Sequence, residues 1–154
     1  APKPGAWLLH GGSPRYQLYP LADGRLLAVG ALEEKFWRAF TALVGLPSTL
    51  SDDRLDPGAT KAAIATWAAG QMSETLRPRL MAADCCATIV ATLDEALADP
   101  HFVSRGLFDN KVQCGEAALG ACVMPLDRSF RAATPLIAAP TLGAANAHYL
   151  SSSA

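Results

Sequence analysis

Apolar residues near the start of the chain form two short stretches on either side of a turn signal. Residues 16–19 and 25–29 are mostly apolar, and Ala22-Asp23-Gly24 separates them. Glycine accepts the positive φ that a tight hairpin requires. The pattern therefore predicts two antiparallel strands that are joined at Asp23-Gly24.

From Leu32 onward the apolar residues repeat at helical spacing. We expect a helix to begin within about two residues of Leu32. Glu33 and Glu34 then fall in its first turn, where the helix dipole favours acidic side chains. Gly45 and Pro47 are expected to end the helix. One face of this helix carries Leu32, Phe36, Phe40, Leu43 and Val44.

Further helices are indicated by residues that commonly cap helix ends. Asp56-Pro57 predicts the start of a helix that ends near Gly70. Ser73 is expected to cap the next helix, because a serine hydroxyl accepts a free backbone N–H there. Pro78 is expected to shorten or kink the first turn of that helix.

The second half of the chain has weaker signals. Residues 86–90 form a small apolar run that suits a buried strand. Thr92-Leu93-Asp94-Glu95 has the spacing of a capping box, and Asp99-Pro100 predicts another helical turn. Beyond Asn110, the Gly-, Ala- and Pro-rich sequence predicts an irregular path. The elements together predict an α+β fold with a short antiparallel sheet and helices.

Composition narrows the classes of function. The 154 residues are 51% hydrophobic and 18% charged, which is enough apolar material for the core of one domain or of part of a larger one. The formal net charge is −1 and Lys and Arg do not cluster, so we expect no nucleic-acid partner. No apolar run is long enough to span a membrane, and no signal peptide is recognisable.

The cysteines and histidines do not have the spacing of a metal site. Cys85, Cys86, Cys114 and Cys122 form no C-x-x-C pair, and the three histidines lie far apart. We therefore expect no metal, and reduced thiols in a cytoplasmic protein. Cys85 and Cys86 are interpreted as small buried apolar residues rather than nucleophiles.

Several motifs occur together in an order that is typical of one enzyme family. Two departures accompany them: Ile89 stands where the family commonly has proline, and residues 114–122 are unusually rich in Ala and Gly. With these motifs the chain resembles the family III CoA-transferases, the carnitine dehydratase and alpha-methylacyl-CoA racemase family. The motifs are Gly11-Gly12-Ser13-Pro14-Arg15-Tyr16, Ala22-Asp23-Gly24, Val29-Gly30-Ala31-Leu32-Glu33, Ala83-Asp84-Cys85-Cys86, Leu93-Asp94-Glu95-Ala96, Asp99-Pro100-His101-Phe102, Arg105-Gly106-Leu107-Phe108 and Pro140-Thr141-Leu142-Gly143.

The resemblance implies that this chain is the C-terminal part of a longer enzyme. Residues 1–14 would be a linker, 15–110 a small α+β domain, and 111–154 an irregular return toward a large domain. In the family, two subunits interlock as a homodimer, and an acyl-CoA thioester lies between the large and small domains. No covalently bound cofactor is implied, and coenzyme A enters as part of the substrate.

The resemblance also implies the reaction. In a transferase branch, an Asp carboxylate of the large domain carries the acyl group. In a racemase branch, a His and an Asp exchange the α-proton of a 2-methylacyl-CoA. These groups precede the present chain, which we expect to be inactive alone. The alternative is a stand-alone, non-catalytic binding or assembly module that reuses the small-domain fold.

Two residues are the site candidates. By resemblance, Glu33 is the catalytic candidate, a carboxylate of the racemase branch that supports the catalytic His. Its other interpretation is an ordinary acid at a helix start, like Glu34. Tyr16 is the substrate-binding candidate beside the acyl pocket. Its other interpretation is a hairpin residue that packs across to Leu27.

Overall fold

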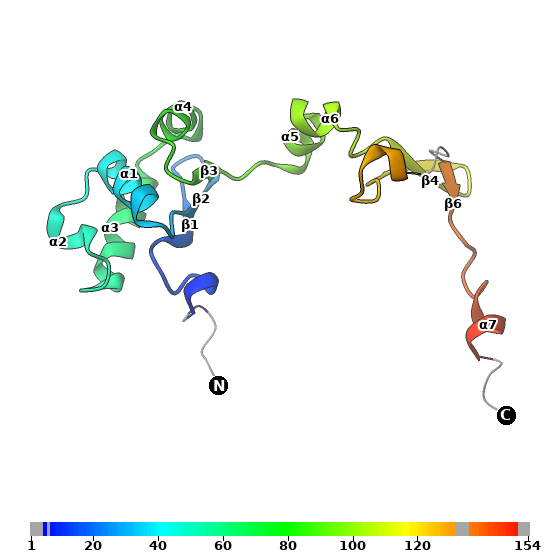
Figure 1. The fold of residues 1–154 in the computed structure, drawn as a ribbon, viewed down its shortest axis with the longest axis horizontal. Coiled ribbons are helices and arrows are strands. Elements are labelled where there is room, and N and C mark those ends of the chain that lie inside the picture. The colour runs from blue at the N-terminus through cyan, green and yellow to red at the C-terminus, as the bar shows by residue number, and fades with distance from the viewer. Residues whose placement is uncertain (1–4, 6, 132–135, 151–154) are drawn as a thin grey trace. The chain divides into compact units, whose positions relative to one another are not determined.

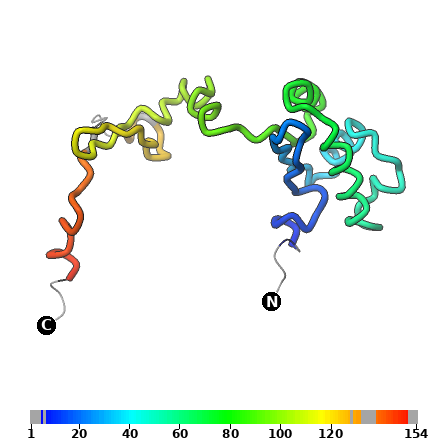
Figure 2. Tube along the Cα trace, turned by 180° about the vertical axis from the view of Figure 1, so that it is seen from behind, coloured from blue at the N-terminus to red at the C-terminus, as the bar shows by residue number. Residues whose placement is uncertain are grey.

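The fold is described from a computed structural model, which covers residues 5, 7–131 and 136–150 (Figure 1). The chain divides into two compact units, Ala1–Val90 and Ala91–Ala154, and each is described by itself. Figure 2 follows the chain through both units from the first residue to the last. The division expected from the sequence, at residues 14 and 110, stays a prediction.

The first unit is built on a three-stranded antiparallel sheet. Strands β1 (Tyr16–Pro20), β2 (Leu26–Gly30) and β3 (Ala87–Ile89) lie in the order β1-β2-β3. The predicted hairpin is confirmed, and Gly24 has the positive φ of 77° that its turn requires. The predicted strand at residues 86–90 is confirmed with slightly shorter bounds.

Helices cover one face of this sheet. α1 (Glu34–Val44), α3 (Pro57–Ala69) and α4 (Ser73–Ala83) lie next to it in Figure 1, and the short α2 (Ser48–Ser51) joins α1 to α3. Strand residues alternate, because one set faces the helices and the other faces away. The core formed in this way contains Tyr19, Leu27, Val29, Trp37, Phe40, Ile64, Leu76 and Ile89.

The face of α1 differs slightly from the predicted one. Trp37 and Phe40 are fully buried, whereas Phe36, Leu43 and Val44 are only partly buried. Phe40 therefore lies on the predicted face, and Trp37, which hydrophobic spacing did not place there, is buried beside it. The predicted end is confirmed, because Gly45 has a φ of 75° and its N–H bonds the carbonyls of the last turn.

Capping residues agree with the sequence in most places. Asp56 accepts the N–H of Ala59 at 2.8 Å, and Thr92 forms the predicted capping box at the start of α5 (Leu93–Ala98). The prediction for Ser73 was wrong. Ser73 is the first residue of α4, and its N–H donates to Asp23 Oδ2 at 2.9 Å.

The turn of the hairpin therefore caps α4 from 50 positions away in the sequence. A carboxylate satisfies a free N–H at a helix start as well as a local hydroxyl does. Pro78 lies in the interior of α4, which continues through it to Ala83.

The second unit contains more regular structure than the sequence predicted. α6 (Pro100–Ser104) follows α5, and its cap is Asp99, as predicted. The path after Asn110 is not irregular: β4 (Asn110–Cys114), β5 (Ala117–Ala121) and β6 (Leu136–Ala138) form a sheet in the order β5-β4-β6. β5 is antiparallel to β4 and β6 is parallel to it. α7 (Asn146–Leu150) is the last helix described.

The strand β5 escaped prediction because it consists largely of small side chains. Ala and Gly in β5 give no alternation of large apolar and polar residues, so pairing of the backbone alone defines the strand. Pro135, which the sequence placed on an irregular path, lies outside the described residues.

The two units differ in how they bury apolar residues. Every buried apolar side chain of the core, among the described residues, belongs to the first unit. In the second unit large apolar side chains such as Leu93, Phe130 and Tyr149 are about three-quarters exposed. No helix in the described part of the chain is both long enough and apolar enough to cross a membrane.

Candidate functional site

Glu33 is the residue directly before α1. Its backbone is extended, with φ −74° and ψ 142°, and its carbonyl accepts the N–H of Trp37 at 3.0 Å, the first bond of the helix. The expected place in the first turn was therefore wrong by one residue, because hydrophobic spacing does not resolve helix ends to a single position. Only Glu34 lies in the first turn.

The Glu33 carboxylate is exposed and makes no capping hydrogen bond. The free backbone N–H groups at the start of α1 therefore do not hold this carboxylate. Glutamate is also not among the residues that commonly occupy this cap position, because Ser, Thr, Asp and Asn reach the free N–H groups better. The side chain is thus available to a partner, while its backbone is fixed.

An ionic cluster next to Glu33 consists of Arg15, Glu34 and Asp53. Arg15 donates from Nη2 to Asp53 Oδ1 at 2.8 Å and from Nε to both carboxylate oxygens of Asp53 at 3.1 Å. It also donates from Nη1 to Glu34 Oε2 at 3.0 Å and to the carbonyl of Leu32 at 3.3 Å. This Arg15 cluster joins the residue before β1, the start of α1 and the segment after α2.

Burial makes the pair of Arg15 and Asp53 the strong part of this cluster. Their side chains are 16% and 10% exposed, while that of Glu34 is 56% exposed. The hydrogen bond to Asp53 is the main cause that raises the pKa of Arg15. Arg15 and then Arg38 lower the pKa of Glu34 by hydrogen bonding to it, so both members of that pair stay charged near neutral pH.

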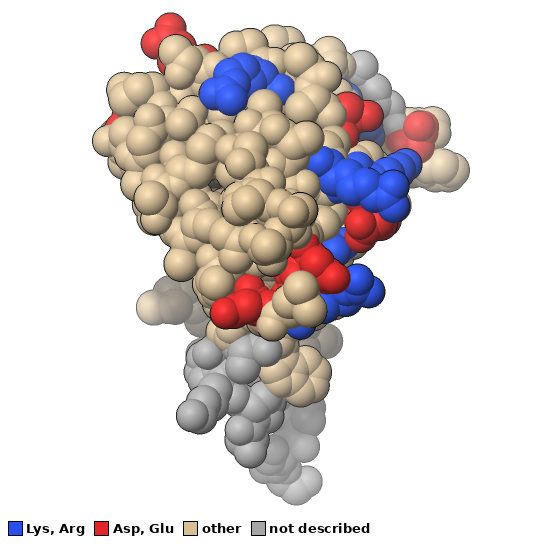
Figure 3. Space-filling view, turned by 90° about the vertical axis from the view of Figure 1, so that its left-hand side faces the viewer, with Lys and Arg blue, Asp and Glu red and all other residues tan. Residues whose placement is uncertain are grey.

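A hollow lies beside the Arg15 cluster. Its volume is about 640 Å³ and its walls are mostly charged. Figure 3 shows one face of the chain, on which Lys and Arg lie next to Asp and Glu on one side of a broad surface without charge. The hollow is lined by Leu8, Ser13, Arg15, Leu32, Glu34, Arg38, Asp53 and Arg54.

Tyr16 lies at the start of β1 and is 40% exposed. Its partner across the hairpin is Gly30, and Leu27 pairs with Tyr19 instead. The interpretation that Tyr16 packs across to Leu27 was therefore wrong, because the register of the hairpin places them three positions apart along β2. Gly30 has no side chain, so one side of the Tyr16 ring has no cross-strand neighbour.

Tyr16 lines a groove of about 620 Å³ on the sheet. The short 3-10 helix Leu8–His10 forms part of its wall. Nearly all of the lining is apolar or neutral, which suits a flexible apolar chain better than a phosphate. The lining residues are Leu9, His10, Gly11, Tyr16, Gln17, Leu18, Ala28, Val29, Gly30, Cys86 and Thr88.

Gly11 and Gly12 form a turn. Gly11 has a φ of 81°, and its carbonyl accepts from Gln17 Nε2 at 3.0 Å and Lys61 Nζ at 3.3 Å. The N–H of Gly12 donates to the carbonyl of Trp7 at 2.9 Å. These groups are therefore occupied within the chain.

Tyr16 and Glu33 do not share a hydrogen bond in the described structure. Arg15 connects their surroundings instead, because it directly precedes Tyr16 and contacts the residues on both sides of Glu33. Sequence reasoning missed both Arg15 and Asp53 as site residues. They lie 38 positions apart, so no local spacing indicates their pairing.

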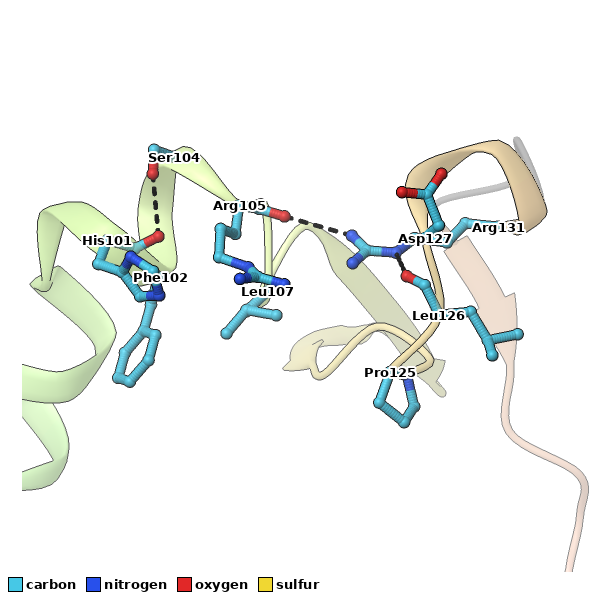
Figure 4. A pocket seen from close by; sticks show the side chains of 9 residues that line it. All are labelled: His101, Phe102, Ser104, Arg105, Leu107, Pro125, Leu126, Asp127 and Arg131. Carbon is cyan, nitrogen blue, oxygen red and sulfur yellow. Dashed lines mark hydrogen bonds between the residues drawn. The ribbon is translucent and has the colours of Figure 1, made fainter.

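A separate hollow of about 700 Å³ occurs within the second unit (Figure 4). Two arginines, Arg105 and Arg131, line it. Arg131 is occupied by backbone oxygens: Nε donates to the carbonyl of Leu126 at 2.9 Å and Nη1 to that of Arg105 at 3.2 Å. His101 is exposed at its rim, with its ring edge-on to Phe102. Arg131 braces the loop there and leaves its charge little freedom to hold a ligand.

The four cysteines are free thiols, and only Cys85 among them is buried. Cys85 is buried, and burial is the main cause that raises the pKa of its thiol, which disfavours the thiolate. Cys86, Cys114 and Cys122 are exposed, so the interpretation of Cys86 as buried was wrong. Within the described residues, no three Asp, Glu, His or Cys side chains come together as a metal site.

Comparison with known proteins covers almost the whole chain. Residues 4–146 match the model of CoA-transferase family III. Alpha-methylacyl-CoA racemases from Homo sapiens and Mus musculus are each 33% identical over 109 residues, which are 68% of this chain and 28% of the racemase. The chain thus corresponds to less than a third of these relatives.

The fold also matches solved structures. Two crystal structures of Rv3272 from Mycobacterium tuberculosis, one of them a point mutant, each have a TM-score of 0.62 to this chain. They are 22% and 21% identical to it and cover 95% and 92% of it, and the match spans 42% of the Rv3272 chain. At this level of identity the likeness concerns the fold.

Proposed function

This chain belongs to CoA-transferase family III, and we propose that it is the C-terminal part of an enzyme that exchanges the α-proton of a 2-methylacyl-CoA. The observation that carries the proposal is the 33% identity to alpha-methylacyl-CoA racemases over 68% of the chain. The family match by itself supports a CoA-thioester enzyme. The racemase reaction is the more specific proposal.

Proton exchange at the α-carbon requires a base that removes the proton and an acid that returns it to the other face. By resemblance, a His and an Asp outside this chain have these roles. The proton passes from carbon to imidazole, the electron pair is held in an enolate, and a proton then returns from the opposite side. An imidazolium forms during this exchange and requires a nearby negative charge.

Glu33 is proposed to supply that charge. Its carboxylate is exposed and makes no capping hydrogen bond, and its backbone is fixed at the start of α1. Such a carboxylate accepts an imidazole N–H and stabilises the cation. The apolar groove beside Tyr16 is proposed to receive part of the acyl-CoA, since its lining suits a flexible chain of low charge.

The chain by itself is proposed to be inactive, because the proton-exchanging groups lie outside it. We also propose that the complete protein is a homodimer in the cytoplasm. The exposed apolar side chains of the second unit support a role inside a larger assembly, since large apolar patches on a protein surface are commonly covered by a partner.

The test uses the complete protein that contains this chain. It is incubated with a single enantiomer of a 2-methylacyl-CoA in D₂O, and mass spectrometry follows deuterium at the α-carbon. We expect incorporation with loss of optical purity, and no transfer of CoA to added carboxylic acids. Transfer without deuterium incorporation would establish the transferase reaction and refute the proposal.

Glu33→Gln in the same protein is expected to lower kcat for exchange by about 10- to 1,000-fold, within the range of general acid–base contributions. The KM should change less, because the lost charge stabilises the transition state of proton transfer and not the bound substrate. Glu74→Gln is the matched control, since Glu74 is an exposed acid in the first turn of α4. An unchanged kcat for Glu33→Gln would assign Glu33 to the simple role of a helix-start acid.

A further inference from the structure

We propose that Arg15 is the residue that positions Glu33 for proton exchange. The inference rests on the proposed function of Glu33 and adds the means by which its backbone is held. Arg15 reaches the residue on each side of Glu33 and leaves Glu33 itself free.

Asp53 and Trp37 fix the position of the Arg15 guanidinium. Arg15 Nη2 and Nε bind the Asp53 carboxylate at 2.8 and 3.1 Å in a bidentate pair that is largely shielded from water. Its guanidinium carbon lies 4.9 Å from the centre of the buried Trp37 ring. With these two contacts the guanidinium group of Arg15 has little freedom to rotate.

Arg15 also binds the residues at the start of α1. The remaining nitrogen, Nη1, donates to the carbonyl of Leu32 at 3.3 Å and to Glu34 Oε2 at 3.0 Å. These two acceptors bracket Glu33 in the chain. A fixed Leu32 carbonyl and a fixed Glu34 together restrict the backbone of the residue between them.

The charge of Arg15 is balanced by carboxylates other than that of Glu33. Two carboxylates, those of Asp53 and Glu34, already accept from Arg15, and Arg38 adds a second cation to Glu34 at 3.3 Å. Arg15 is therefore neutralised within its own cluster. None of the hydrogen bonds that Arg15 donates in the described structure goes to the Glu33 carboxylate, which therefore stays available to a partner outside this chain.

A change at Arg15 should thus act through Glu33 and on kcat. Misplacement of a catalytic group by about 1 Å can lower the rate about 100-fold. We expect Arg15→Met in the complete protein to lower kcat for deuterium exchange by about 10- to 100-fold while KM changes less than about threefold. Arg54→Met is the control, because Arg54 forms an exposed pair with Asp52 beside the same hollow and, among the described residues, donates no hydrogen bond to Leu32 or Glu34.

A double-mutant cycle with Glu33→Gln separates positioning from general damage. If Arg15 acts through Glu33, adding Arg15→Met to Glu33→Gln should lower kcat no further. An equal loss of kcat in both backgrounds, or an equal loss from Arg54→Met, would overturn the inference while leaving the function of Glu33 intact. Unchanged kcat in Glu33→Gln alone would overturn the proposed function, which is a different pattern.

Arg15→Lys guards against a variant that fails to fold. Lysine keeps the charge beside Asp53 but lacks the planar fork that reaches Leu32 and Glu34 at the same time. If circular dichroism shows that Arg15→Met is unfolded, the cycle is made with Arg15→Lys. The same non-additivity with Glu33→Gln is then expected, and additive losses would again reject the positioning role.

Discussion

The guanidinium of Arg15 lies over the indole of Trp37, with its central carbon 4.9 Å from the ring centre. The same indole donates from Nε1 to the carbonyl of Ser51 at 2.7 Å. Trp37 thus contacts both the residue before β1 and the end of α2, close to Asp53. The face of a tryptophan attracts a cation, so the ring and the Asp53 carboxylate hold Arg15 from different directions.

Asp53→Asn should destabilise the first unit. It removes the charge partner from an arginine whose side chain is only 16% exposed, and hydrogen bonds to charged groups contribute more than neutral ones. We expect the free energy of unfolding to fall by about 2–3 kcal/mol. Urea denaturation of the 154-residue chain, followed by tryptophan fluorescence, measures this change.

Asp52→Asn is the control for this measurement, because the Asp52–Arg54 pair is exposed at the neighbouring position. Exposed ion pairs contribute little, so we expect no measurable change. Equal losses in the two variants would show that the Asp53 pair has no special role.

Glu33→Ser should stabilise the chain while removing the proposed site carboxylate. A serine hydroxyl at this cap position accepts a free N–H of the first turn of α1, which Glu33 does not do. The expected gain is about 0.5–1 kcal/mol in the free energy of unfolding. Glu74→Ser, which lies inside the first turn of α4, should give no such gain. A loss of stability in Glu33→Ser would contradict the described cap.

Gly45→Ala should lower the free energy of unfolding by about 1–2 kcal/mol. Gly45 has a φ of 75°, and a Cβ there would meet no atom within 4 Å, so the cost comes from the backbone alone. Gly70 ends α3 with a φ of −94°, which any residue adopts. Gly70→Ala should therefore be neutral or slightly stabilising. Thermal unfolding of both variants compares them, and equal shifts would count against the positive φ at Gly45.

Cys85 should resist alkylation in the folded chain. Its thiol is buried and its pKa is raised by that burial, so little thiolate is exposed to the reagent. A Cys86→Ser variant avoids the adjacent exposed thiol. With iodoacetamide at about pH 8, we expect Cys114 and Cys122 to react at once and Cys85 only after denaturation. Mass spectrometry of the peptides measures the labelling of each cysteine. Labelling of Cys85 before denaturation would contradict the prediction.

Hydrogen exchange should differ between the two units of the isolated chain. The buried core lies in the first unit, and the second unit has many exposed apolar side chains among its described residues. Amides of β1 and β2 should therefore be protected, and those of β4 and β5 should exchange much faster. In the complete protein we expect protection of β4 and β5 to increase. Equal protection in the isolated chain would indicate that the second unit is stable alone.

Much of the fold was predictable because its signals are local. The hairpin at Asp23-Gly24, the caps at Asp56 and Thr92, and the glycine end of α1 each depend on residues within about five positions. Such signals specify backbone conformation directly. The strand β5 lacked one, since its small side chains carry no alternating pattern.

The candidate site was only partly predictable. The family motif indicated Glu33 and Tyr16 as candidates, and their proposed roles stay predictions. The motif did not indicate that the Glu33 side chain makes no cap, or that Tyr16 faces Gly30 across the hairpin. Both depend on the exact start of a helix and the register of a strand pair, which hydrophobic spacing leaves uncertain by a residue or more.

The sequence by itself determined the α+β class, the hairpin and main helices of the first unit, and the family of this chain, because turn, cap and motif signals act over a few neighbouring residues. The tertiary structure alone decided which distant groups meet. Asp23 caps α4 from 50 positions away, and Asp53 holds Arg15 across 38 positions. A carboxylate bonds whichever donor the packed core brings within about 3 Å, and that proximity is a property of the folded chain and not of residue spacing.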